Sequence, residues 1–184
     1  MQESKRIRVL LAEDHAIVRE GLRSLLEKQS DIEIISDAED GRMAVELTRE
    51  LEPDVVIMGI TMPNLNGVEA TRQITKEFPQ IKVIALSVHS NRIFVADMLE
   101  AGAVGYVLKE CLFDDLVQAI QAVGDGRTYL SSRITGVVVE DYIKRLVKVS
   151  DSPLSSLTSR KRTCRRRKVD QRDCFRASCK YQDD

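Results

Sequence analysis

The sequence predicts an α/β protein built on a doubly wound parallel sheet. Three observations support this prediction. Strand-like and helix-like segments alternate over residues 1–124, the joins between them are short and rich in turn-forming residues, and residues 55–58 are apolar at every position. Alternation of this kind is typical of parallel sheets with helices on both faces, and a strand that is apolar throughout is expected at the centre of such a sheet.

The first two strand–helix units occupy residues 7–51. Residues 7–12 form a short apolar run that predicts a strand, and residues 32–35 predict a second strand. A helix is expected after each of them, the second over residues 41–51 and closed by Pro53. Both helices are predicted from apolar residues three and four positions apart. These are Val18, Leu22, Leu25 and Leu26 in the first helix, and Met43, Ala44, Leu47 and Leu51 in the second.

Three further strands and helices complete the predicted sheet. The expected elements are a strand over 55–58, a loop over 61–67 with a helix to about residue 78, a strand over 81–86, a helix over 92–101, a strand over 104–108 and a helix over 112–123. The total is five strands and five helices, and an apolar stripe within residues 128–148 predicts a linker helix after them. Because crossovers between parallel strands are right-handed, we expect the flavodoxin-like strand order.

Composition places the chain among soluble globular proteins, with 43% hydrophobic and 31% charged residues. No apolar run approaches the roughly 18 residues of a membrane span, and the polar start is unlike a signal peptide, so we expect a cytoplasmic protein that has no contact with membranes. The four cysteines match no zinc-site spacing, which makes reduced thiols the expected state.

Charge is distributed unevenly along the chain. Residues 1–159 carry 18 Lys and Arg against 25 Asp and Glu, whereas residues 160–184 carry ten against four and contain no Leu or Ile. A segment of that composition cannot form a helical core. We therefore expect a globular domain over residues 5–124, a linker with a helix over 125–159 and a disordered basic tail over 160–184.

Polar side chains follow several of the predicted strands. Glu13 and Asp14 follow the first strand, Thr61 the third, Ser87 the fourth and Lys109 the fifth. In doubly wound sheets these ends meet at one edge. Paired carboxylates with a backbone carbonyl suit Mg²⁺, and a lysine and a hydroxyl suit a phosphoryl group. Each residue alone is typical of an ordinary surface loop, and only the set predicts a phosphate-handling pocket.

Five stretches carry a resemblance to a known family: RVLLAEDH (8–15), PDVVIM (53–58), MPNLNGVEA (62–70), IALS (84–87) and AGAVGYVLK (101–109). Over about residues 5–159 the chain resembles the receiver domain of two-component response regulators of the NarL/FixJ subfamily, which regulate transcription. The resemblance implies a partner sensor histidine kinase and dimerisation, and it implies a regulator and not an enzyme.

The resemblance also implies a role for each residue of the pocket. Glu13, Asp14 and the backbone carbonyl of Thr61 are expected to hold Mg²⁺. Ser87 is expected to contact the phosphoryl group and Lys109 to pair with it. Tyr106 is expected to be the switch residue, which rotates on activation.

The sequence departs from the family at the phospho-accepting aspartate, because Gly59 stands at that position. Asp54 lies at the opposite end of the same strand, about 16 Å away at 3.3 Å per residue. Asp14 is the least poor surrogate and Thr61 lacks a base. We therefore expect no phosphorylation at the usual position and a weakened Mg²⁺ site. A natural substitution, an engineered one and an evolved pseudo-receiver remain open as origins of Gly59.

A second departure begins within residues 154–160, where the subfamily opens its helix-turn-helix domain. The basic tail follows in this chain instead, and in a shifted reading frame residues 167–182 can encode a string that resembles part of that domain. The hypothesis is that a frameshift replaced the DNA-binding domain. Specific operator binding is therefore not expected, whereas non-specific, salt-sensitive binding to nucleic acid through the tail is an alternative.

The sequence thus predicts a two-component response regulator, by ancestry a transcription regulator. One alternative is a phosphorylation-independent receiver that acts by protein contacts, either by dimerising with an intact regulator or by occupying its kinase. Another is a basic-tailed nucleic-acid binder. A flavodoxin-like enzyme is disfavoured because the loop after the first strand has no phosphate-cradling sequence, and Glu13 and Asp14 would repel an anionic cofactor there.

Overall fold

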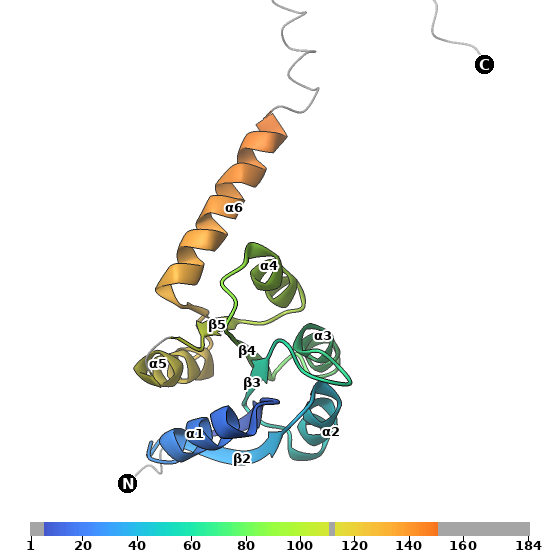
Figure 1. The fold of residues 1–184 in the computed structure, drawn as a ribbon, viewed down its shortest axis with the longest axis vertical. Helices are drawn as coiled ribbons and strands as arrows, with labels where there is room; N and C mark the ends of the chain where they lie inside the picture. Colours follow the sequence, from blue (N-terminus) through green and yellow to red (C-terminus); the bar gives the residue numbers. More distant parts are fainter. Residues whose placement is uncertain (1–5, 111–112, 151–184) are drawn as a thin grey trace, which may run out of the picture. The chain divides into compact units, whose positions relative to one another are not determined.

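The computed structural model describes residues 6–110 and 113–150. Within them a six-stranded parallel sheet alternates with six helices (Figure 1). The elements are β1 (Ile7–Ala12), α1 (Ala16–Leu26), β2 (Ile32–Ala38), α2 (Gly41–Leu51), β3 (Val55–Gly59), α3 (Gly67–Glu77), β4 (Lys82–Ser87), α4 (Arg92–Glu100), β5 (Gly105–Leu108), α5 (Phe113–Gly124), β6 (Tyr129–Leu130) and α6 (Ser132–Ser150). The predicted α/β class is confirmed.

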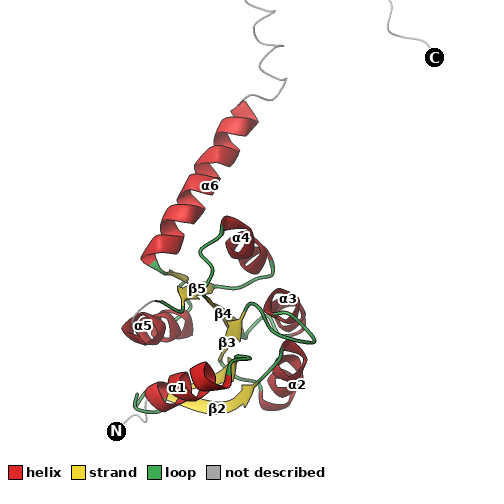
Figure 2. Cartoon of the chain, in the orientation of Figure 1, coloured by secondary structure: helices red, strands yellow, loops and turns green. Residues whose placement is uncertain are grey.

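The strand order is β2-β1-β3-β4-β5-β6, which is the predicted flavodoxin-like order with one strand added at the edge. Helices α1 and α5 lie on one face of the sheet, and α2, α3 and α4 lie on the other (Figure 2). Each face has its own apolar core, and all five residues of β3 are buried between the two cores. The sequence-based placement of this strand at the centre was therefore right.

A linker helix was predicted within residues 128–148, but the first part of this segment forms strand β6. The segment first pairs with β5: the Tyr129 amide donates to the Val104 carbonyl at 3.1 Å, and the Ser131 amide donates to the Tyr106 carbonyl at 3.0 Å. These two bonds hold the backbone extended, and α6 begins only at Ser132. Ile134, in the first turn of α6, is fully buried.

Two of the apolar residues from which α1 and α2 were predicted lie at the surface, each more than a third exposed. Leu25 is 38% exposed and Met43 is 39% exposed. In α2 the buried face is rotated, so that Val45 and Thr48 pack inward. The Thr48 hydroxyl is satisfied there because it donates to the Ala44 carbonyl at 2.7 Å. A threonine could therefore take a core position that an apolar pattern assigns to another residue.

Helix α3 begins in close contact with the end of β3. A Cβ atom on Gly67 would lie 1.9 Å from the Gly59 carbonyl oxygen, so only glycine fits there. The Gly67 amide also donates to the Ile60 carbonyl at 2.9 Å. The backbone at position 59 is thereby fixed by the helix that follows it.

Some predictions concern residues outside this description. The predicted tail, residues 160–184, lies outside it, as does Cys111. In the described part of the chain, no helix combines the length and the apolar character that a membrane crossing needs.

Candidate functional site

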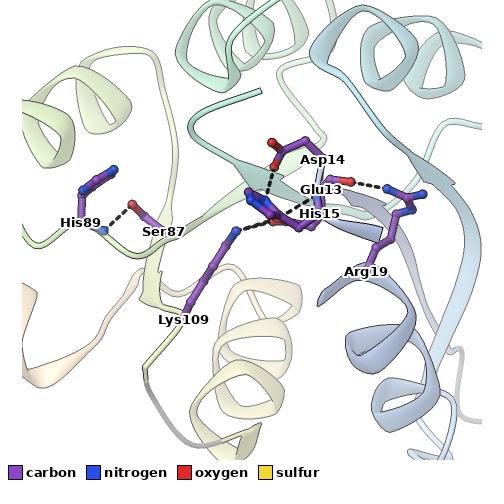
Figure 3. Close-up of polar contacts among 7 residues, drawn as sticks. All are labelled: Glu13, Asp14, His15, Arg19, Ser87, His89 and Lys109. Atoms are coloured by element: carbon purple, nitrogen blue, oxygen red, sulfur yellow. Dashed lines mark hydrogen bonds and ion pairs between the residues drawn. The ribbon is translucent and has the colours of Figure 1, made fainter. Parts of the chain in front are cut away.

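The loops that follow β1 and β5 bring an acidic and a basic side chain together. Glu13 directly follows β1 and is fully buried. Lys109 directly follows β5, and its Nζ donates to Glu13 Oε1 at 2.7 Å (Figure 3). The same Nζ lies 2.7 Å from Oε2. The two residues, 96 positions apart in the chain, form an ion pair at the edge of the sheet where parallel strands end.

The two oxygens of the Glu13 carboxylate differ in their hydrogen bonding. Oε1 also accepts from the His15 amide at 3.3 Å and lies 3.1 Å from His15 Nδ1. Oε2 is within ion-pair distance of Lys109, yet no donor is aligned with it in hydrogen-bond geometry. One buried carboxylate oxygen thus retains the capacity to bind a further cation or donor.

Asp14 lies beside Glu13 and is paired with His15. His15 Nδ1 lies 2.8 Å from Asp14 Oδ1. Burial pushes the pKa of Asp14 upward, but the hydrogen bond and charge of His15 outweigh it and hold that pKa below its ordinary value. In turn, the hydrogen bond to Asp14 raises the pKa of His15. Ligand atoms of these two residues and of Glu13 all lie within 4.8 Å of one another.

Position 59 faces the Glu13 carboxylate. A Cβ atom on Gly59 would lie 3.2 Å from Glu13 Oε2 and 3.3 Å from the Ala12 carbonyl oxygen. The residue at the end of β3, where the resemblance puts the family's phospho-acceptor, therefore lies against the Glu13 carboxylate. The backbone of Gly59 needs no left-handed conformation, so a side chain there would be tight against these two oxygen atoms but would not strain the backbone.

Ser87 and Tyr106 both hydrogen-bond to the backbone of His89. The Ser87 hydroxyl accepts from the His89 amide at 2.9 Å, and the Lys109 amide donates to the Ser87 carbonyl at 2.7 Å. Tyr106 is fully buried, its hydroxyl donates to the His89 carbonyl at 2.8 Å, and burial raises its pKa. The His89 ring stacks on Phe94 of α4, with ring centroids 4.9 Å apart.

The site brings together most of the residues predicted from the sequence. Glu13, Asp14, Lys109 and position 59 are grouped by the contacts above, and Ser87 lies at the end of the neighbouring strand β4. Thr61 lies exposed in the loop that follows β3. Two members were missed: His15, and Arg19, whose Nη1 donates to the Glu13 carbonyl at 2.6 Å. The position of His15 directly after the acidic pair was a usable signal.

The side chains of the acidic pair suit Mg²⁺, which prefers oxygen ligands. Two adjacent carboxylates are present, and one buried oxygen of Glu13 has no aligned hydrogen-bond donor. These residues fit a divalent cation, which Glu13 and Asp14 would hold. A third carboxylate is missing at position 59, and the Lys109 ammonium already pairs with Glu13.

Comparison with known proteins agrees with this geometry. Residues 9–121 match the model of the response regulator receiver domain. The transcriptional regulatory protein DegU of Brevibacillus brevis is 38% identical over 152 residues, which cover 83% of this chain and 64% of DegU. LnrK of Bacillus subtilis (strain 168) is 39% identical over 136 residues, 74% of this chain and 62% of LnrK. The chain thus spans less than two thirds of these two relatives.

Solved structures point the same way. A two-component response regulator of the LuxR family from Aurantimonas sp. SI85-9A1 superposes with a TM-score of 0.72 at 37% identity, over 76% of this chain and 99% of that one. The isolated receiver domain of RcsB from Salmonella enterica serovar Typhimurium gives 0.67 at 25% identity, over 72% and 99%. With its fold, its strand-end site and its sequence in agreement, the chain belongs to the family of response regulator receiver domains.

Proposed function

We propose that this chain is a two-component receiver that works without phosphorylation at position 59. The observation that carries the proposal is the pairing of Lys109 with Glu13 beside a glycine. A glycine has no nucleophile with which to take up a phosphoryl group. The lysine that pairs with that group in the family already has an anionic partner in the resting protein.

The Glu13–Lys109 pair supports this proposal energetically. Glu13 is fully buried and the Lys109 side chain is only 18% exposed. Removing one partner of a buried pair leaves the other charge without compensation, which is strongly unfavourable. Lys109 therefore stays with Glu13 when no phosphoryl group is present, so the buried carboxylate has a charged partner without one.

Mg²⁺ is the cofactor we propose, held more weakly than at a site with three carboxylates. Glu13 and Asp14 would be its carboxylate ligands and the Thr61 carbonyl a further one. Two features support weak binding: the missing carboxylate at position 59, and the Lys109 ammonium, which repels a second cation near Glu13.

We propose a sensor histidine kinase as the partner, together with a second copy of this chain or an intact regulator, in the cytoplasm. In this role the chain acts by occupying a protein surface and not by passing on a phosphoryl group. Relatives named as transcriptional regulators support an ancestry in transcription control.

Phosphorylation assays test the proposal directly. With acetyl phosphate and Mg²⁺, the unchanged protein should take up no phosphoryl group. In the Gly59→Asp variant the new carboxylate should attack phosphorus, forming a base-labile aspartyl phosphate and releasing acetate. Gly59→Asn is the matched control, with the same shape and no nucleophile. Stoichiometric labelling of the unchanged protein would overturn the proposal, and its loss in Asp14→Asn would identify Asp14 as the surrogate.

The composition of residues 160–184 favours a second candidate, non-specific binding of nucleic acid. Ten basic residues against four acidic ones can contact phosphates without reading bases. Binding to a random-sequence duplex should then weaken steeply as salt rises, with no preference for a defined operator. Affinity that is independent of salt would contradict it. Reading the gene in all three frames beyond codon 159 tests the proposed frameshift origin of the tail.

A further inference from the structure

Arg19 reaches from α1 back to the end of β1. Its Nη1 donates to the backbone carbonyl of Glu13 at 2.6 Å, and its side chain is only 14% exposed (Figure 3). This carbonyl belongs to the peptide that joins Glu13 to Asp14. A rotation of that peptide would displace both carboxylates of the acidic pair at once.

The guanidinium also forms an ion pair with Asp37, although Arg19 Nε makes no aligned hydrogen bond. Arg19 Nε lies 3.3 Å from Oδ2 of Asp37 in β2. Asp37 also pairs through Oδ1 with Arg23, one helical turn further along α1. Arg19 is therefore held on one side by a strand and holds the loop after β1 on the other.

Glu13 is bound from both directions as a result. Its amide donates to the Ala38 carbonyl at the end of β2 at 2.9 Å, while its carbonyl accepts from Arg19. Strand pairing thus fixes the N–H side of this residue, and Arg19 fixes the C=O side. Arg19 is thus the side chain that holds the carbonyl of the peptide between Glu13 and Asp14.

We propose that Arg19 is a positioning residue for the divalent-cation site at Glu13 and Asp14. It touches no ligand carboxylate and acts through the peptide that carries both. The inference rests on the proposed metal site and deepens it. Groups that orient metal ligands typically change metal affinity by about 10- to 100-fold when they are removed.

The charge of Arg19 and its contact with the Glu13 carbonyl have opposite effects on cation binding. The positive charge of Arg19 disfavours a nearby cation, whereas its fixed contact favours one by orienting the ligands. Lysine keeps the charge but lacks the planar fork that contacts the Glu13 carbonyl and Asp37 together. Arg19→Lys therefore isolates the geometric effect.

The test uses the full chain carrying Gly59→Asp, which restores a third carboxylate. The Mg²⁺ Kd is obtained from the melting temperature at increasing Mg²⁺ concentration, because a ligand that binds only the folded state stabilises it. Adding Arg19→Lys should raise Kd about tenfold. Adding Arg23→Lys is the matched control: Arg23 also pairs with Asp37 and does not reach Glu13, so Kd should stay within about twofold of the background.

A second variant keeps the inference testable if Arg19→Lys does not fold. Asp37→Asn leaves Arg19 in place and removes its charged partner, and it should raise Kd by less than the roughly tenfold expected for Arg19→Lys. Unchanged Kd in both variants overturns the positioning role, even if both lower the melting temperature in metal-free buffer. A Gly59→Asp background without any Mg²⁺ response overturns the metal site itself, before any substitution of Arg19, and the positioning role falls with it.

Discussion

An aspartate introduced at position 59 would add a third carboxylate beside Glu13 and Asp14. The new Cβ would lie 3.2 Å from Glu13 Oε2 and 3.3 Å from the Ala12 carbonyl oxygen, so its neighbours must shift by a few tenths of an ångström. At a separation of about 5 Å, two carboxylates repel each other by roughly 3 kcal/mol with an effective dielectric constant of about 20. Lys109 offsets part of this repulsion.

We therefore expect Gly59→Asp to lose about 1–2 kcal/mol of stability in metal-free buffer at neutral pH. For a chain of this length, that corresponds to a fall of about 2–8 °C in melting temperature. Mg²⁺ should reverse the loss: at a concentration one hundred times its Kd, a bound ligand stabilises the fold by about 2.7 kcal/mol. The unchanged protein should gain little over the same range.

Thermal unfolding of three proteins, with chelator and with Mg²⁺, separates the effects. Gly59→Asn has nearly the shape of Gly59→Asp without its charge, so it should lose only the steric part and gain nothing extra from Mg²⁺. An equal Mg²⁺ response in the unchanged protein and in Gly59→Asp would refute the placement of residue 59 beside the acidic pair. Absence of any response in Gly59→Asp would refute it as well.

Three other predictions follow from the same contacts. Gly67→Ala should destabilise the fold by about 3 kcal/mol, because its Cβ would meet the Gly59 carbonyl oxygen. Gly21→Ala, with nothing within 4 Å, should instead stabilise α1 by about 0.5–1 kcal/mol. Denaturant unfolding measures both effects, and equal effects would contradict the packing. Tyr106→Phe should lower the free energy of unfolding by about 1 kcal/mol, because the hydrogen bond to the His89 carbonyl is lost. It should also speed amide hydrogen exchange over residues 87–94, and unchanged exchange would argue against a role for this hydrogen bond. Asp14→Asn should lower the pKa of His15 toward its ordinary value of 6.5, which NMR titration of the imidazole measures. Because the fold raises that pKa, the contact stabilises the protein fully below pH 6.5, and its contribution is lost as pH rises through the raised pKa. A titration of His15 that Asp14→Asn leaves unshifted would contradict the pairing.

The sheet could be predicted from the sequence because its strands are marked by short apolar runs with clear ends. Strand β1 was placed at its observed bounds, and β3 was identified as central because all of its residues are apolar. The rotation of α2 was not predictable from apolar spacing alone, since Thr48 buries its hydroxyl by bonding within the helix. Strand β6 has only two residues, too few to show any periodicity.

The site was predictable to the extent that parallel strands end at a common edge. That rule grouped Glu13 with Lys109, although 96 positions separate them. It could not identify Arg19, because nothing in a helical arginine indicates that its guanidinium turns back to a carbonyl six positions earlier. Nor could it predict that Lys109 would pair with Glu13 when position 59 is a glycine. The partner of the lysine depends on the burial of the carboxylates and on their distances from its ammonium group.

Strand β6 also protects the sheet from unwanted association. Without it, β5 would present unpaired backbone groups at Gly105 and Tyr106, the two residues that pair with β6, at the open side of the sheet. Exposed apolar edges of this kind recruit strands from other molecules. A chain shortened to residue 124 would keep every residue of the site and still lose this cover, so it should aggregate more readily than one that continues through Ser131. The two residues of β6 therefore contribute to solubility out of proportion to their number.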